Sequence, residues 1–469
     1  MAVTQAHLSK VRAKYAVTST TLFENAPDLH ADLVSPASLP AGVPSDLASR
    51  AAWGSAADNE TSLDWNGEAD AQDTLLVASG MDAAGVWNGK VGHGLPPRPA
   101  AVRRNRLMGY AGEAAAELEE EAAAVERRDR RLLGKRSTAK KTAKETLTHY
   151  SDEMLWAGEI SIGTPAVSYL VDFDTGSADL WVPSSACTSA ACTSHQAYDA
   201  SASRTSRVQA GAKLSIAYGD GSSTTGKVYK DTVSVAGLTS ANQRFGVATA
   251  ESASFADDPF DGILGLGFQA ISTMGVRPWF QSVIKAGFLK QSRFSFYLAA
   301  KSSELFLGGA NSRRFTSGST VWYPVTSATY WVIKARGYVA GKKVSSLGTF
   351  NAIIDTGTTV VLAPTASAKA FWAKVPNSSA YGGGYYEYDC AMTTAVGLGF
   401  GSSSSSKEWK ISADALNLGL VAVGSSRCVG SVVGADTGLN AWIVGSTFLE
   451  NVYSTFDVDN KRVGFSELA

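Results

Sequence analysis

The sequence predicts an all-β protein with two related lobes behind a long N-terminal leader. From Leu155 onward, short runs of β-branched and aromatic residues are separated by Gly, Ser, Asp and Asn at intervals of roughly ten residues, which is typical of short strands joined by turns. Two motifs of this region also recur later in it at nearly one common offset. Forty-five glycines fit a chain rich in turns and disfavour a helical bundle.

Residues 1–146 differ in composition from the rest and are interpreted as a leader, partly disordered or loosely helical. Residues 113–126 are rich in Ala and Glu and fit an exposed helix. The stretch 63–126 fits either a genuine insertion or a wrongly joined exon. A basic run follows, in which Asp129 is the one acid among Arg127, Arg128, Arg130, Arg131, Lys135, Arg136, Lys140, Lys141 and Lys144.

The elements of the body follow from local patterns. Residues 167–173 predict a strand that runs into a turn, and 213–218 with 225–233 predict a hairpin around the Gly, Asp and Ser residues between them. Residues 278–286 predict a helix, because Pro stands at the start and Gly follows the end. A second helix is expected over 365–374.

Two short motifs recur along the body and indicate a duplicated lobe. Phe-Asp-Thr-Gly-Ser at 173–177 recurs as Ile-Asp-Thr-Gly-Thr at 354–358, an offset of 181 residues (355 − 174). Ile-Leu-Gly at 263–265 recurs as Ile-Val-Gly at 443–445, an offset of 180 residues (445 − 265). Two unrelated motif pairs that share one offset to within a residue are not expected by chance.

Each expected lobe, 147–325 and 326–469, contributes one Asp-Thr-Gly turn at the end of an apolar strand. A symmetric pair of lobes would bring Asp174 and Asp355 face to face, where two carboxylates share one proton and titrate as a coupled pair. One carboxylate can then accept a proton from water while the other donates one to a carbonyl oxygen. This chemistry hydrolyses an amide without a metal or a covalent intermediate, so we expect no cofactor and no metal.

The net charge is close to zero, with 42 Lys and Arg against 43 Asp and Glu. Nucleic acids and anionic membrane surfaces require a sustained excess of basic residues, so neither partner is expected. No apolar run approaches the ~18 residues of a spanning helix, so we expect no membrane anchor. Residues 1–15 lack the apolar core of a secretory signal, and no signal peptide is evident in this sequence.

Longer motifs around the two turns resemble those of the pepsin-like aspartic proteases of eukaryotes, of the fungal type, from about residue 155 to 469. The stretches 174–182 and 353–359 resemble the two active-site loops of that family. The stretches 260–267 and 442–449 resemble the strands that cross behind those loops, and 456–465 resembles the closing hairpin. The resemblance implies a bilobal fold of two β-barrel-like lobes with an active-site cleft between them.

The resemblance also implies roles for the residues of the two turns. Asp174 and Asp355 would be the catalytic dyad that holds the attacking water. Ser177 and Thr358 would hydrogen-bond the outer carboxylate oxygens. The other turn residues would support the dyad, the threonines by bracing the loops against each other and the glycines by aiming backbone N–H groups at the carboxylates: Thr175, Thr356, Gly176 and Gly357.

The hairpin at 213–233 resembles the family's flap, a lid that closes over the substrate. Tyr218, with Gly219 after it, would be the flap tyrosine that pairs with Trp181. Asp220 would let the site accept Lys or Arg before the scissile bond, besides large apolar residues. Phe255 would line the same apolar pocket. The plainer alternatives are that Tyr218 is a hairpin aromatic packed on its neighbour and that Asp220 is a residue suited to the turn.

Four cysteines, Cys187, Cys192, Cys390 and Cys428, allow three pairings. Proximity favours Cys187 with Cys192 and Cys390 with Cys428, and the family has the same pattern of one small loop per lobe. Such bonds predict an oxidising compartment. A zinc site is the competing interpretation, but the spacing of Cys187 and Cys192 is not that of a zinc knuckle and the loop lacks ligand histidines.

The resemblance implies an aspartic endopeptidase that acts on peptides at acidic pH, is made as a zymogen, and is a secreted or vacuolar monomer. Its leader would inhibit it as a propeptide, with a base of 127–144 paired to the dyad until acid weakens the pair. Lys135-Arg136 offers a processing site, and Asn59 and Asn377 lie in glycosylation sequons. The alternatives are a binding or inhibitor protein that kept the fold without activity, and a serine hydrolase, whose motif is absent.

Overall fold

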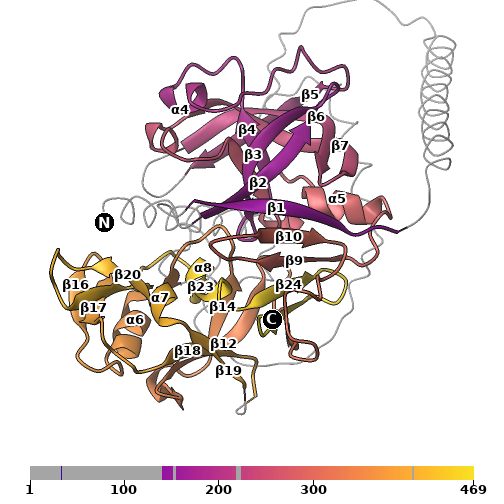
Figure 1. Cartoon of the computed structure of the whole chain (residues 1–469). Coiled ribbons are helices and arrows are strands. Elements are labelled where there is room, and N and C mark those ends of the chain that lie inside the picture. Colours follow the sequence, from indigo (N-terminus) through magenta and orange to yellow (C-terminus); the bar gives the residue numbers. More distant parts are fainter. Residues whose placement is uncertain (1–32, 34–139, 151–154, 218–222, 404–405) are drawn as a thin grey trace, which may run out of the picture. The chain divides into compact units, whose positions relative to one another are not determined.

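Figure 1 shows the computed structural model of the chain. The structure describes Leu33 and residues 140–150, 155–217, 223–403 and 406–469, all of which belong to one compact unit. The helix expected over 113–126 and the rest of the leader before residue 140, apart from Leu33, lie outside the described residues.

Strands dominate the described part of the chain, which confirms the prediction of an all-β protein. Those of the first half are β1 (Ala143–Tyr150), β2 (Leu155–Ile162), β3 (Val167–Asp174), β4 (Leu180–Pro183), β5 (Arg207–Ala217), β6 (Ser223–Val235), β7 (Leu238–Glu251), β8 (Gly262–Gly265), β9 (Arg293–Tyr297), β10 (Ser303–Leu307) and β11 (Val321–Pro324). Those of the second half are β12 (Val332–Val339), β13 (Lys342–Lys343), β14 (Phe350–Ile354), β15 (Val361–Ala363), β16 (Ser379–Gly382), β17 (Tyr385–Asp389), β18 (Val396–Phe400), β19 (Glu408–Ile411), β20 (Asn417–Leu420), β21 (Arg427–Gly430), β22 (Val432–Gly434), β23 (Ala441–Val444), β24 (Tyr453–Asp457) and β25 (Arg462–Ser466).

The helices are short. They are α4 (Ala190–Thr193), α5 (Trp279–Lys285), α6 (Thr365–Trp372), α7 (Ala413–Leu416) and α8 (Ser446–Leu449), with 3-10 turns η3 (Ala253–Phe255), η4 (Gln269–Ile271) and η5 (Ser345–Leu347).

Three sheets carry the strands. The largest has the order β11-β25-β24-β9-β10-β1-β2-β3-β8-β4-β7-β6-β5, the second has the order β19-β18-β12-β14-β23-β15-β22 with β13 paired to β12, and the third has the order β16-β17-β21-β20. Strands β1, β10, β9 and β24 lie side by side in Figure 1. The last hairpin of the chain, β24-β25, therefore belongs to the sheet that begins in the first half.

The recurring sequence motifs occupy equivalent places in the two halves. Strand β3 runs parallel to β8, with Asp174 opposite Gly265, and β4 runs antiparallel to β8. Strand β14 runs parallel to β23, with Ile354 opposite Val444, and β15 runs antiparallel to β23. Each motif pair thus folds into the same three-strand unit, as a duplicated lobe requires.

Other predicted elements are present with small differences at their ends. The strand over 167–173 is β3, and the hairpin strands are β5 and β6, with residues 218–222 between them outside the described part. Helix α5 begins after Pro278 and is followed by Gly287, whose φ of 74° is a conformation that favours glycine. Helix α6 ends at Trp372, before the expected Lys374.

Strand β1 begins at Ala143, inside the stretch assigned to the leader. It begins there because residues 143–147 pair with β10, which extends the sheet beyond the expected lobe boundary. The division into a leader of 1–146 and lobes of 147–325 and 326–469 otherwise stays a prediction.

A cluster of aromatic side chains fills the region where the two halves meet. Phe294 stacks on Phe456 with ring centroids 4.9 Å apart, and Trp331 meets both rings edge to face. The Trp331 Nε1 donates to the Leu266 carbonyl oxygen at 3.1 Å, so its buried polar atom is satisfied across the halves. Each such buried ring contributes roughly 1.5–3 kcal/mol, so this cluster gives the site a firm support.

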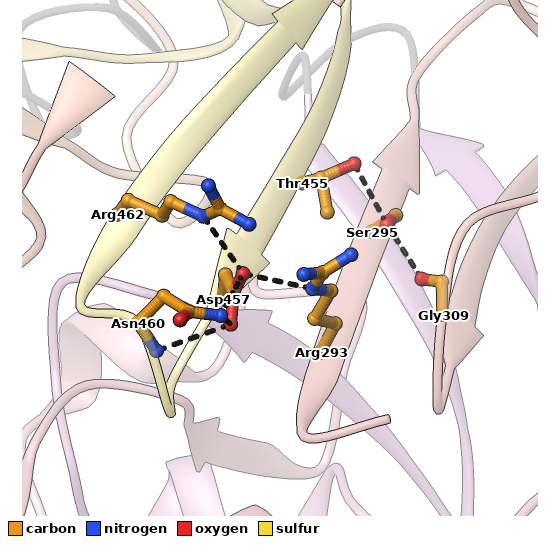
Figure 2. A network of polar contacts seen from close by, with 7 residues as sticks. All are labelled: Arg293, Ser295, Gly309, Thr455, Asp457, Asn460 and Arg462. Atoms are coloured by element: carbon orange, nitrogen blue, oxygen red, sulfur yellow. Dashed lines mark hydrogen bonds and ion pairs between the residues drawn. The ribbon is translucent and has the colours of Figure 1, made fainter. Parts of the chain in front are cut away.

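A buried carboxylate anchors the last hairpin to the central strands, as Figure 2 shows. Asp457 in β24 accepts from Arg293 Nε of β9 at 2.8 Å and from Arg462 Nε of β25 at 2.9 Å, and Asn460 Nδ2 also donates to it. Burial alone would raise the pKa of Asp457, but the hydrogen bonds from Asn460 and Arg462 and the charge of Arg293 outweigh it and hold that pKa below its ordinary value. The group therefore stays ionised in moderate acid.

We predict that Asp457→Asn lowers the free energy of unfolding by roughly 2–3 kcal/mol at pH 6, because two arginines lose a charged acceptor. The stabilisation by a carboxyl of lowered pKa is present above the ordinary Asp pKa of ~4 and is lost as pH falls through the lowered value. The deficit of the variant should thus shrink as pH falls below the ordinary Asp pKa of ~4. Urea unfolding at pH 6, 4 and 2.5 measures this.

The matched control is Asp459→Asn, which changes an exposed carboxyl of the same turn and should leave stability unchanged at every pH. An equal deficit for Asp457→Asn at pH 6 and at pH 2.5 would contradict the assigned role of the charge.

Candidate active site

The two Asp-Thr-Gly turns lock onto each other through their threonines. The backbone N–H of Thr175 donates to Thr356 Oγ1 at 3.0 Å, and that of Thr356 donates to Thr175 Oγ1 at 2.9 Å. Each hydroxyl in turn donates across the pair, Thr175 Oγ1 to the Ile354 carbonyl at 2.8 Å and Thr356 Oγ1 to the Phe173 carbonyl at 2.6 Å. All of these groups are buried, so the network fixes the turns rigidly relative to each other.

The network brings the two carboxylates to one place. Asp174 and Asp355 are 2% and 0% exposed. The Gly176 N–H donates to Asp174 Oδ1 at 2.8 Å, and the Gly357 N–H donates to Asp355 Oδ1 at 3.1 Å. A Cβ atom on Gly357 would lie 2.5 Å from Asp174 Oδ1, so the carboxylate of the first turn packs directly on the backbone of the second.

The hydroxyls three residues after each Asp behave differently. Thr358 Oγ1 donates to Asp355 Oδ2. Ser177 Oγ is buried and has no hydrogen-bond partner among the described residues, so its expected contact with Asp174 is not formed. The difference has a physical basis, because a β-branched threonine is restricted about χ1 whereas a serine hydroxyl rotates between rotamers.

The glycines of the second motif pair have a steric role that the sequence did not reveal. A Cβ on Gly265 would lie 2.5 Å from backbone atoms of Ala178, and one on Gly445 would lie 2.1 Å from the Thr358 carbonyl oxygen. The loop after each Asp therefore crosses directly over its glycine. Hydrogen bonds from Gly267 N to Ser177 O and from Ser446 N to Thr358 O close these crossings at 2.7 Å.

Asp179 fixes the far end of the first loop and was missed as a site residue. Its buried carboxylate accepts from Ser272 Oγ at 2.5 Å and from the backbone N–H and hydroxyl of Thr273, each at 2.7 Å. Burial raises the pKa of Asp179, and these hydrogen bonds oppose the rise. The one signal in the sequence was that Asp179 is the acidic residue in the otherwise apolar stretch 178–182, which leads into β4.

The structure brings Trp181 and Phe255 together and leaves the flap tip outside its described part. Their rings meet edge to face with centroids 5.7 Å apart, in a buried cluster with Leu214 and Ala248. Tyr218, Gly219 and Asp220 lie outside the described residues. The base of this hairpin is anchored, since Ser223 N donates to Ser252 Oγ at 2.7 Å and Ser252 N donates to Ser223 O at 3.0 Å.

Both disulfides have the expected pairing, Cys187 with Cys192 and Cys390 with Cys428. The thiols are therefore not available as zinc ligands, and no group of three or more His, Cys, Asp and Glu side chains suited to a metal occurs in the described part of the chain. Among the described residues, no helix is long and apolar enough to cross a membrane.

Comparison with known proteins agrees with this geometry. The family "Eukaryotic aspartyl protease" matches residues 155–468. An aspartic protease of Phaffia rhodozyma is 45% identical over 344 residues, which cover 72% of this chain and 81% of the relative. Pepsin A of Rhinolophus ferrumequinum is 34% identical over 342 residues (71% and 86%), and embryonic pepsinogen of Gallus gallus is 37% identical over 324 residues (67% and 81%).

A two-lobed β fold that holds two buried aspartates on interlocked turns defines the class of acid proteases that act through a carboxyl pair. With the family match, the chain belongs to the eukaryotic aspartyl proteases and is an aspartic-type endopeptidase of the pepsin family.

Proposed function

We propose that this endopeptidase hydrolyses peptide bonds at acidic pH with Asp174 and Asp355 as its catalytic dyad. The observation that carries the proposal is the packing of the Asp174 carboxylate against Gly357 of the second turn, with one oxygen of each aspartate held by a backbone N–H. Two such carboxylates cannot both ionise cheaply and share a proton. The ionised one takes a proton from water as it attacks the peptide carbonyl, and the protonated one donates to the carbonyl oxygen.

The rest of the site supports this division of work. The inner carboxylate oxygens accept from Gly176 and Gly357, and Asp355 Oδ2 accepts from Thr358. These fixed donors hold each carboxyl plane in one orientation, so no reorganisation is needed when the water attacks. A binding protein without activity has no need of two carboxylates and a Ser or Thr three residues after each. This chain keeps all four of these residues, Asp174, Ser177, Asp355 and Thr358.

We further propose that the pocket beside the flap favours large apolar residues before the scissile bond and also accepts Lys or Arg. The buried pair of Trp181 and Phe255 supports the apolar preference. The Asp220 carboxylate, which follows the flap tyrosine by two residues, is placed by the sequence to pair with a basic side chain.

The proposal also includes a zymogen whose leader inhibits the enzyme. Leu33, in the leader, is 2% exposed and belongs to a cluster of buried side chains with Ala178, Tyr330 and Leu439. Its carbonyl oxygen accepts from Asn440 N at 2.6 Å. Because Ala178 follows the first active-site turn, this contact supports a leader held against the second half of the enzyme close to its site.

Three bases of the run 127–144 lie in the part of the chain that the structure describes. Lys140, Lys141 and Lys144 are exposed. The Lys141 backbone donates to the Phe288 oxygen and accepts from Lys290 N, and Lys144 lies in β1, which pairs with β10. The other bases of 127–144 lie outside the described residues. The disulfides and the exposed Asn377 of a sequon support a secretory or vacuolar setting and a glycoprotein. That the enzyme acts as a monomer is likewise a proposal.

We predict that Asp174→Asn and Asp355→Asn each lower kcat/KM for casein-derived peptides by at least about 10³-fold at pH 4, because the shared proton and the acceptor for water are lost. Activity of the native enzyme should rise as pH falls from 7 to 4. Circular dichroism of both variants should match the native chain, and Asp459→Asn serves as the active control. Retention of a tenth of the native activity in either variant would refute the dyad.

For the flap, we predict that Asp220→Asn lowers kcat/KM about tenfold for a peptide with Lys before the scissile bond, which is the loss of one partly screened ion pair. The same substitution should change kcat/KM less than twofold for the matched peptide with Phe. Equal losses on both peptides would show that Asp220 is structural and not a specificity residue.

For the leader, we predict that Leu33→Asp shortens the lag before activity appears after acidification, because a buried apolar contact of roughly 1.5–3 kcal/mol is replaced by an unpaired charge. Leu33→Met, which keeps the apolar contact, should leave the lag near the native one. A native lag in Leu33→Asp would rule out an inhibitory role for this contact.

A further inference from the structure

His195 stands between two backbone carbonyls that it can satisfy only as a cation. Its Nδ1 lies 2.7 Å from the Ala191 oxygen and its Nε2 lies 2.9 Å from the Asp258 oxygen. A carbonyl oxygen can only accept, so both ring nitrogens must carry a proton, and both do so only in the imidazolium form. The second polar neighbour of Nδ1, Ser194 Oγ, lies farther away at 3.3 Å.

The two carbonyls belong to separate elements beside the apolar pair of the proposed substrate pocket. Ala191 lies in α4, within the loop closed by the Cys187–Cys192 disulfide, and its side chain is buried in the cluster of Trp181 and Phe255. Asp258 lies three residues after Phe255, in the segment 256–261 that leads from η3 to β8. Helix α4 packs on η3 and on β7.

Two further contacts, on either side of His195, join the residues after α4 to the segment 256–261. Ser194 Oγ donates to the Ala191 oxygen at 2.9 Å and also lies 3.3 Å from the Ala256 oxygen, and Gln196 N donates to Asp261 Oδ1 at 2.8 Å. The other oxygen of Asp261 accepts from Leu170 N at 2.8 Å. His195 is thus the central one of three consecutive residues beside this segment, and its contacts with both carbonyls require a proton on each ring nitrogen.

Glu251 at the end of β7 interacts electrostatically with His195. The segment 256–261 also carries Asp257, Asp258 and Asp261, and α4 itself carries no charge. Glu251 is 7% exposed, and its Oε1 has no hydrogen-bond partner among the described residues. Burial raises the pKa of Glu251 to about 7, the His195 charge lowers it and the Asp258 charge raises it.

We propose that the His195 imidazolium is a positioning residue, which clasps α4 to the segment 256–261 and thereby holds Phe255 against Trp181 in the substrate pocket. With both ring nitrogens protonated the clasp is closed. When the ring gives up one proton, one of the two N–H donors is lost, a nitrogen lone pair then faces a carbonyl oxygen, and the segment 256–261 loosens. The clasp itself does not depend on the dyad, although its effect on catalysis rests on the proposed function.

Hydrogen exchange of the full chain tests the clasp without any need for activity. We expect the amides of 256–261, corrected for intrinsic exchange, to lose about tenfold in protection between pH 5 and pH 8, as for one hydrogen bond of ~1.4 kcal/mol. The amides of α8, far along the chain, serve as the internal reference. His195→Ala should show the low protection already at pH 5, and His195→Arg, a permanent cation, should show little change with pH.

The variant Glu251→Gln distinguishes the contribution of the histidine from that of the neighbouring carboxyl. Because a glutamine at position 251 does not titrate, the loss of protection of 256–261 with rising pH should persist in this variant. If the loss disappears in Glu251→Gln and remains in His195→Arg, the carboxyl and not the imidazole is the switch, and the proposal is wrong.

Two further measurements keep the proposal testable if a variant fails to fold. In the native chain labelled with ¹⁵N-histidine, both ring nitrogens of His195 should carry protons at pH 5, and a neutral ring there would overturn the proposal. Kinetics with a Phe-containing peptide are measured from pH 4.5 to pH 6.5. As pH rises, KM of the native enzyme should increase relative to KM of His195→Arg, whereas the ratio of their kcat values should stay constant. If the Asp174 and Asp355 variants keep activity while the exchange of 256–261 behaves as expected, the proposed function is refuted and the proposed clasp is not.

Discussion

The mutual hydrogen bonding of Thr175 and Thr356 is the constraint on which the rest of the site depends. Two carboxylates in a buried place repel each other once both ionise, and nothing in their own chemistry would keep them there. The threonines hold the turns together through four hydrogen bonds that join backbone and hydroxyl groups of both halves. These bonds are neutral, so their strength does not change with the pH at which the dyad shares its proton.

That constraint explains why much of the site was predictable from the sequence. The turn motif and the apolar strand before it recur once, and a recurrence can be detected without a structure. The second motif pair was predictable for the same reason, although its physical cause is a close approach: backbone atoms of Ala178 and Thr358 leave no room for a Cβ on Gly265 and Gly445. The fold class followed likewise from turn residues at regular intervals.

The contacts that sequence reasoning missed are those that depend on tertiary packing. Leu33 is one apolar residue in an Ala-rich leader, and nothing around it indicates that it lies buried beside Tyr330 and Leu439. His195 is separated by 63 residues from the Asp258 carbonyl that it binds. Ser177 illustrates the opposite case, because the motif predicts its partner while the rotamer decides whether the contact forms.

The buried carboxyls show how the fold matches its charges to acid. Asp457 has three cationic or amide donors and stays ionised, so it stabilises the last hairpin down to low pH. Glu251 and Glu450 have their pKa raised to about 7, in both cases mainly by burial. Their contribution to stability is fully present below the ordinary Glu pKa of ~4.5 and is lost as pH rises through about 7, where they ionise. These two glutamates therefore favour the folded state most in the acidic range, in which a carboxyl pair can also share one proton.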